Sequence, residues 1–103
     1  MPEIVVCQVG DVAPNSAIRV DRGGLRLAVV RIGDDWYALG DRCSHAEASI
    51  AEGEVWPDEL EIECPKHGSS FSVKTGEPLT LPATQPVPTY PVRVDGDDVL
   101  VRI

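Results

Sequence analysis

The residues best suited to chemistry in this chain are its cysteines and histidines, and most of them fall into two short clusters. The sequence has three cysteines and two histidines in 103 residues. The first cluster is Cys43-Ser44-His45, and the second is Cys64-Pro65-Lys66-His67. Each cluster supplies one thiol and one imidazole, and 18 residues separate them. Scattered placement would rarely produce this pattern, so the four residues indicate a shared site.

Several kinds of site use cysteine and histidine, and the spacing helps to separate them. Structural zinc sites usually pair like residues within each half, whereas each half here carries one of each. A Cys/His nucleophilic dyad would use one cluster and leave the other idle. An odd cysteine count and an N-terminus without an export signal favour a reducing cytosol, which disfavours a Cys43–Cys64 disulfide. Ordinary buried or surface residues stay an alternative for either cluster taken alone.

An iron–sulfur cluster with two thiolates on one iron and two imidazoles on the other uses both halves. This is the ligation of a Rieske [2Fe-2S] centre. Residues i and i+2 of an extended loop point the same way, so Cys43 and His45 can address neighbouring irons. Pro65 restricts its own φ, which lets the second cluster turn tightly toward the same pair of irons.

At these residues the chain resembles the Rieske family. The family motif Cys-x-His…Cys-Pro-x-His-Gly-Ser appears here as Cys43–His45 and Cys64–Ser69. The similarity extends to Trp36–Leu39, to Thr75–Pro78 and to the ending Tyr90–Ile103. It therefore covers nearly the whole sequence.

The resemblance implies a ligand set and a fold. Cys43 and Cys64 would hold the inner iron of one [2Fe-2S] cluster, and His45 and His67 the solvent-facing iron. The fold would be all-β, with stacked antiparallel sheets in a single domain of residues 1–103. A small cluster-binding subdomain would cover about residues 41–73.

Departures from the family pattern indicate which branch the chain resembles. The membrane-bound cytochrome bc branch has an extra cysteine in each loop, but Ala48 and Lys66 stand here, so that disulfide cannot form. The oxygenase α-subunits need a second domain with a mononuclear iron, for which 103 residues are too few. A stand-alone ferredoxin is left, an electron carrier rather than an enzyme.

In the best-known cases such a ferredoxin passes electrons from a flavoprotein ferredoxin reductase to the oxygenase terminal component of an aromatic-ring dioxygenase. Three alternatives stay open. One is the small Rieske subunit of a nitrite-reductase-like complex, the second is a ferredoxin associated with iron–sulfur assembly, and the third is a zinc-bound interaction module.

Short strands must position the two clusters. Apolar residues alternate with polar ones, as in half-buried strands, in four runs: Leu25–Ile32, Leu60–Cys64, Tyr90–Asp95 and Val99–Ile103. Gly- and Asp-rich turns lie between the runs. Nine prolines and nine glycines exclude a long helix, so only Ser44–Ile50 and Val9–Pro14 could form a helical turn. We expect an all-β domain of about eight to ten short strands.

The charge balance limits the partners. Seventeen acidic residues against nine basic ones give a net charge of −8. This argues against nucleic acid and against an anionic membrane surface, and favours a basic partner. No apolar run approaches the roughly 18 residues of a membrane span. We expect a cytoplasmic monomer.

Residues near the clusters carry further expectations. In the high-potential Rieske branch, a serine at the position of Ser69 and a tyrosine at that of Phe71 donate hydrogen bonds to sulfur. Phe71 cannot donate, which should lower the potential. Leu81-Pro82-Ala83-Thr84 resembles the proline-containing loop that shields the cluster. Cys7 fits a buried core thiol.

An acidic run lies between the clusters, without lysine or arginine: Glu47, Glu52, Glu54, Asp58, Glu59, Glu61 and Glu63. It is either a solvated strand face or a rim that steers a basic partner.

Overall fold

Ten short strands in three antiparallel sheets make up most of the part of the chain that the structure describes. The computed structural model describes residues 3–22, 24–42, 48–66, 68–80 and 85–102. The first sheet has the order β1-β10-β9, from β1 (Glu3–Gln8), β9 (Val92–Asp95) and β10 (Asp98–Arg102). The second has the order β2-β3-β4-β8, from β2 (Ser16–Arg22), β3 (Leu25–Ile32), β4 (Asp35–Gly40) and β8 (Thr89–Tyr90). The third has the order β5-β6-β7, from β5 (Val55–Trp56), β6 (Glu61–Glu63) and β7 (Ser70–Ser72). The expected all-β fold is confirmed.

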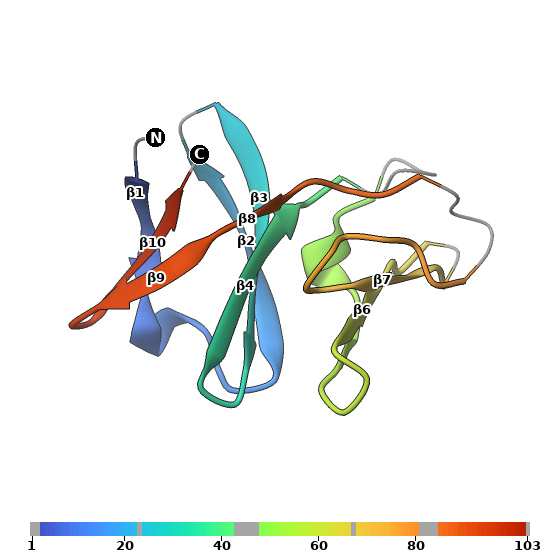
Figure 1. The fold of residues 1–103 in the computed structure, drawn as a ribbon, viewed down its shortest axis with the longest axis horizontal. Coiled ribbons are helices and arrows are strands. Elements are labelled where there is room, and N and C mark those ends of the chain that lie inside the picture. Colours follow the sequence, from blue (N-terminus) through green and yellow to red (C-terminus); the bar gives the residue numbers. More distant parts are fainter. Residues whose placement is uncertain (1–2, 23, 43–47, 67, 81–84, 103) are drawn as a thin grey trace.

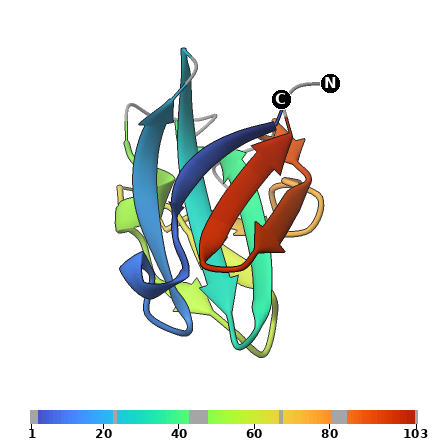
Figure 2. The same cartoon turned by 90° about the vertical axis from the view of Figure 1, so that its left-hand side faces the viewer.

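The second sheet is the middle layer of the molecule. Figure 1 shows the first sheet on one side of it and the third sheet on the other, and Figure 2 looks onto the first sheet with the second behind it. The side of the second sheet that faces the first sheet is covered by the base core, defined as Val6, Leu27, Val29, Ala38, Val99 and Val101. The opposite side is covered by the site core, defined as Ala28, Val30, Ile32, Leu39, Ile50, Ile62, Cys64, Phe71, Val73 and Val87.

Strand β3 is buried on both faces, so the expectation of a half-buried strand at Leu25–Ile32 is wrong. Leu27 and Val29 pack into the base core, while Ala28 and Val30 pack into the site core, and all four are 0% exposed. The polar residues of the strand, Arg26 and Arg31, lie toward its two ends. A sheet covered on both sides makes its central strand apolar at consecutive positions rather than alternate ones.

The expected strand Tyr90–Asp95 is divided between two sheets at Pro91. Tyr90 pairs with Ala38 of β4, whereas Val92 pairs with Val101 of β10. Proline has no N–H to continue a ladder, but its carbonyl accepts a hydrogen bond from the Arg102 backbone N–H at 3.0 Å. The chain thereby passes from the middle sheet to the first sheet within a few residues.

The described residues include two short 3-10 turns, η1 (Val9–Asp11) and η2 (Ile50–Glu52). The first lies within the expected Val9–Pro14, while the second meets the expected Ser44–Ile50 only at Ile50. Strand β6 begins at Glu61, one residue later than expected, because Leu60 adopts a left-handed φ of 56° in the turn before it. In the described part of the chain, no helix is long and apolar enough to cross a membrane.

Candidate metal centre

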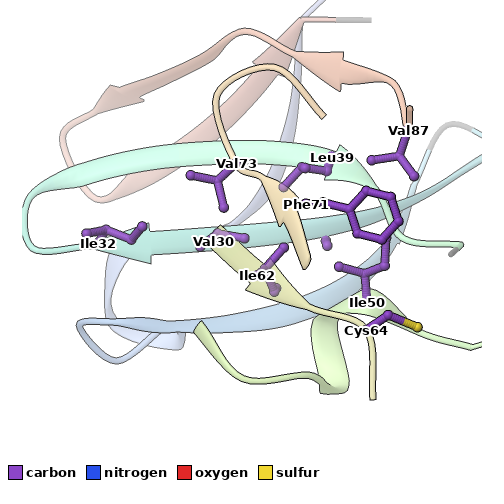
Figure 3. Close-up of a cluster of buried hydrophobic side chains, with 10 residues drawn as sticks. Val30, Ile32, Leu39, Ile50, Ile62, Cys64, Phe71, Val73 and Val87 are labelled. Carbon is purple, nitrogen blue, oxygen red and sulfur yellow. The ribbon is translucent and has the colours of Figure 1, made fainter. Parts of the chain in front are cut away.

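Of the four predicted ligands, Cys64 lies among the described residues, and Cys43, His45 and His67 lie outside them. Cys64 directly follows β6 and is 0% exposed. It belongs to the site core, and Figure 3 shows its side chain at one end of that core, near Ile50. The structure therefore places one predicted sulfur ligand at the edge of the packed interior.

The second Cys/His group, Cys64–His67, is carried by a turn whose base is closed by backbone hydrogen bonds. The Cys64 N–H donates to the Ser69 carbonyl at 2.7 Å, and the Gly68 N–H donates to the Cys64 carbonyl at 3.0 Å. Gly68 has a φ of 72°, a left-handed conformation that glycine adopts without steric cost. Pro65, Lys66 and Gly68 are exposed. The turn is thus fixed at its base, and these three described residues are open to solvent.

The first Cys/His group, Cys43–His45, belongs to a segment that is also closed at its base. The chain leaves β4 into Asp41, and the Ile50 N–H donates back to the Asp41 carbonyl at 2.7 Å. Arg42 and Ser49 form an isolated antiparallel bridge. The Asp41 carboxylate accepts hydrogen bonds from the Ser49 hydroxyl at 2.7 Å and from the Ala51 N–H at 2.8 Å.

Asp41 was missed by the sequence analysis. The signal was a single acidic residue placed between the apolar run Ala38-Leu39 and Cys43. An acidic residue at the end of a buried strand is exposed by default, so the sequence alone gave no reason to expect its complete burial.

Two segments carry the Cys/His groups, residues 42–49 and the Cys64–Ser69 turn. Their described ends meet in the site core. Ile50 from the first segment and Cys64 from the second are both fully buried there, and Ala48 packs against the same core. Figure 3 shows Ile50, Cys64 and Phe71 grouped at one end of it. The two segments are therefore anchored on shared apolar contacts.

A further segment, residues 76–80, packs along β7. The Leu79 N–H donates to the Ser70 carbonyl at 2.7 Å, and the Thr80 hydroxyl accepts from the Ser70 N–H at 2.8 Å. Pro78 forms a bridge with Phe71. The loop expected to shield the cluster, Leu81–Thr84, directly follows but lies outside the described residues.

Ser69 and Phe71, the two positions expected to influence the reduction potential, are both buried. Ser69 and Phe71 are each 0% exposed, and the Phe71 ring lies in the site core with Cys64. Among the described residues, every buried polar side-chain atom has a hydrogen-bond partner, the Ser69 hydroxyl included. The Phe71 side chain offers no O–H.

Six residues of the acidic run, here called the acidic face, lie on β6 or in the segments that precede β5 and connect it to β6. Glu52, Glu54, Asp58 and Glu59 are exposed, Glu61 and Glu63 are half-buried, and Glu47 lies outside the described residues. Across the described ranges, none of these six carboxylates takes part in an ion pair. Trp56 is 41% exposed and pairs with Glu61 across β5 and β6. The face therefore combines unpaired negative charge with an accessible aromatic ring.

Cys7 lies on β1, in the sheet on the far side of the middle layer from Cys64. It is half-buried against the base core, so the expectation of a buried core thiol holds only in part. Burial, with a smaller contribution from the Asp11 carboxylate, raises the pKa of the Cys7 thiol to about 11. A thiol with so high a pKa holds little thiolate near neutral pH and is correspondingly unreactive.

Comparisons with known proteins agree with this geometry. Residues 3–91 match the family described as the Rieske [2Fe-2S] domain. The 3-phenylpropionate/cinnamic acid dioxygenase ferredoxin subunit of Shigella boydii serotype 4 (strain Sb227) is 45% identical over 103 residues, covering 100% of this chain and 95% of that protein.

Two solved structures are similar over almost their whole length. The ferredoxin of carbazole 1,9a-dioxygenase from Nocardioides aromaticivorans IC177 superposes with a TM-score of 0.93 at 40% identity, covering 98% of this chain and 97% of that one. A chain from the complex of reduced oxygenase and oxidized ferredoxin in carbazole 1,9a-dioxygenase gives a TM-score of 0.87 at 42% identity, with coverage of 96% and 91%. The chain therefore belongs to the Rieske [2Fe-2S] domain family, as a ferredoxin that binds a Rieske-type [2Fe-2S] cluster and carries electrons without being an enzyme itself.

Proposed function

We propose that this ferredoxin takes single electrons from a flavoprotein ferredoxin reductase in the cytoplasm and delivers them to the terminal oxygenase of an aromatic-ring dioxygenase. The observation that carries the proposal is the turn Cys64–Ser69, which is closed by backbone hydrogen bonds and anchored in the site core, while Pro65, Lys66 and Gly68 within it are exposed. Such a turn would place a redox group close to a partner's surface. The relatives at 40–45% identity, which are dioxygenase ferredoxins, support this partner class over a nitrite-reductase-like complex.

The chemistry of the donor set fits the cluster. Two thiols and two imidazoles are the donors that a Rieske centre requires, and both segments that carry them end on the same buried core. We assign Cys43 and Cys64 to one iron, and His45 and His67 to the other. The cluster supplies a one-electron couple when bound. The exposed neighbours Lys66 and Gly68 support the assignment of His67 to the solvent side.

We further propose a single domain of residues 1–103 in which residues 41–73 form the cluster-binding subdomain. The third sheet and η2 lie within these bounds. They are joined to the rest through the site core, where Ile62 and Phe71 pack with Val30 and Leu39 of the middle sheet. The subdomain would thus share its core with the larger part of the fold.

The ligand set makes a direct prediction. We expect His67→Ala to abolish the visible absorption spectrum or convert it to that of an altered cluster, because one iron loses an imidazole. Cys43→Ser should prevent full cluster retention. Cys7→Ser is the matched control and should leave the spectrum unchanged. An unaltered spectrum in either ligand variant would refute the assignment.

The turn geometry makes a second prediction, with a matched control in the chain. Gly68 and Gly96 both have a positive φ, of 72° and 62°, and both have open space where a Cβ would stand. Replacing either by alanine should cost roughly 1–2 kcal/mol of unfolding free energy, because L-residues are strained there. Only Gly68→Ala should also accelerate cluster loss to a chelator, since Gly96 lies in the distant β9–β10 turn. Equal rates of cluster loss in the two variants would contradict the role of the Cys64–Ser69 turn.

The third prediction concerns the reduction potential. Rieske centres span roughly −150 to +300 mV, and hydrogen bonds to sulfur raise the value. Phe71 supplies no such bond, Ala48 and Lys66 cannot form the loop disulfide, and the net charge of −8 opposes an added electron. We expect a value in the lower half of the range, near its bottom, and a higher one in Phe71→Tyr. Protein-film voltammetry measures both, and a wild-type midpoint in the upper half would overturn the expectation.

The partner proposal is tested by electron-transfer kinetics with a purified dioxygenase reductase and oxygenase. The acidic face should steer basic partners, so the double substitution Glu54→Gln with Asp58→Asn should slow association about threefold or more at low salt. Asp95→Asn with Asp97→Asn removes the same charge beside the distant β9–β10 turn and serves as the control.

The two pairs of substitutions separate steering from simple net charge. The difference between them should shrink as ionic strength rises, because salt screens exposed charges beyond about 10 Å. Equal slowing of association in both pairs would show that the acidic face does not steer the partner. Failure of the wild type to pass electrons to any such oxygenase would overturn the proposed function.

A further inference from the structure

Asp41 is a charged residue with no exposed surface, two positions before Cys43. Its side chain is 0% exposed. Burying an ionised carboxylate is costly unless hydrogen bonds and opposite charge compensate it. The surroundings of Asp41 supply both, which indicates a specific role for this side chain.

Both carboxylate oxygens of Asp41 accept hydrogen bonds. One accepts from the Arg26 Nε–H at 3.0 Å and from the Ser49 hydroxyl at 2.7 Å. The other accepts from the Ala51 N–H at 2.8 Å. Arg19 Nε lies 3.8 Å from the first oxygen and adds a second positive charge. Hydrogen bonds that involve an ionised group are the stronger ones.

These contacts join the middle sheet to both ends of the segment that carries the first cluster. Arg19 comes from β2 and Arg26 from β3, and the Asp41 N–H donates to the Arg26 carbonyl at 3.0 Å. Ser49 and Ala51 lie where the chain returns and enters η2. The Ser49 side chain makes no capping bond to η2, and Asp41 accepts the Ala51 N–H instead.

We propose that Asp41 is the positioning residue of the first ligand segment, an inference that rests on the assignment of Cys43 and His45 as cluster ligands. The carboxylate fixes where residues 42–49 leave β4 and where they enter η2. It thereby sets the placement of this segment relative to the Cys64–Ser69 turn. The base of the second turn is closed by backbone hydrogen bonds between Cys64 and Ser69 and between Gly68 and Cys64.

Asparagine is the informative substitution because it keeps the shape and removes one acceptor. Arg26 and Ala51 both donate to Asp41, one to each oxygen. In Asp41→Asn, one of these donors faces the amide NH2, which is itself a donor. Leaving a buried donor unpaired destabilises the structure locally.

The test compares Asp41→Asn and Ser49→Ala with a base-core control, Val29→Ala. Asp41→Asn should raise the rate of cluster release to a chelator by about tenfold, the factor that about 1.4 kcal/mol represents. It should also broaden the EPR signal of the reduced protein and speed amide exchange at Ile50 and Ala51 in the cluster-free protein. Ser49→Ala should act in the same direction but less strongly. Val29→Ala should lower the unfolding midpoint without altering release or EPR line shape.

The outcomes separate this inference from the ligand assignment. Wild-type release and EPR in a folded Asp41→Asn protein would overturn the positioning role, whatever the ligand variants show. Equal changes in Val29→Ala would reduce the effect to general stability and also overturn it. If Asp41→Asn does not fold, Ser49→Ala and Arg26→Gln decide: altered release in both supports the role, and wild-type release in both refutes it. A normal spectrum in His67→Ala would instead refute the ligand set.

Discussion

The structure depends on β3, a strand that has no face toward solvent along its middle. Leu27, Ala28, Val29 and Val30 are successive residues, and each is fully buried. Alternate side chains leave the strand in opposite directions, so a strand buried in this way must support one core on each side. The first sheet covers one side, and η2 with the third sheet covers the other. The segments that carry the two Cys/His groups are anchored in the site core. The first sheet packs on the opposite side of the middle sheet and supports it there.

Both segments are closed by backbone hydrogen bonds, and the first has a buried charge in addition. The turn after Cys64 is closed by its own backbone, helped by the left-handed Gly68. A further constraint lies at Glu63, directly before Cys64. Gly53 approaches the Glu63 carbonyl so closely that a Cβ at position 53 would stand 1.5 Å from the oxygen. The first segment is closed by the Ile50 N–H bond to the Asp41 carbonyl, and also by the buried Asp41 carboxylate with two arginines of the middle sheet. Backbone closure and buried charge thus fix neighbouring ends of one apolar core.

Local patterns explain how much of this could be predicted from sequence. The paired Cys/His spacing indicated the type of metal centre, because the predicted ligands fall into two short stretches of the sequence. The turns rich in Gly and Asp gave the hairpins. The layering was harder, because Leu25, Leu27 and Val29 show the alternation of a half-buried strand, and two-sided burial depends on distant strands that cover Ala28 and Val30. Pro91 looked like part of one strand, and only the pairing partners reveal the change of sheet. The burial of Asp41 could not be predicted from the sequence, because Arg19 and Arg26 lie far from it along the chain and contact it only in the folded structure.

The central claim is that both histidines of the chain are ligands of one [2Fe-2S] cluster, and nitrogen hyperfine spectroscopy tests it most directly. The chain has only two histidines, so labelling histidine with ¹⁵N marks His45 and His67 and no other imidazole. Pulsed electron–nuclear double resonance on the reduced protein should resolve two strongly coupled ¹⁵N nuclei that replace two ¹⁴N signals of the unlabelled sample. One coupled nitrogen, or none, would contradict the account.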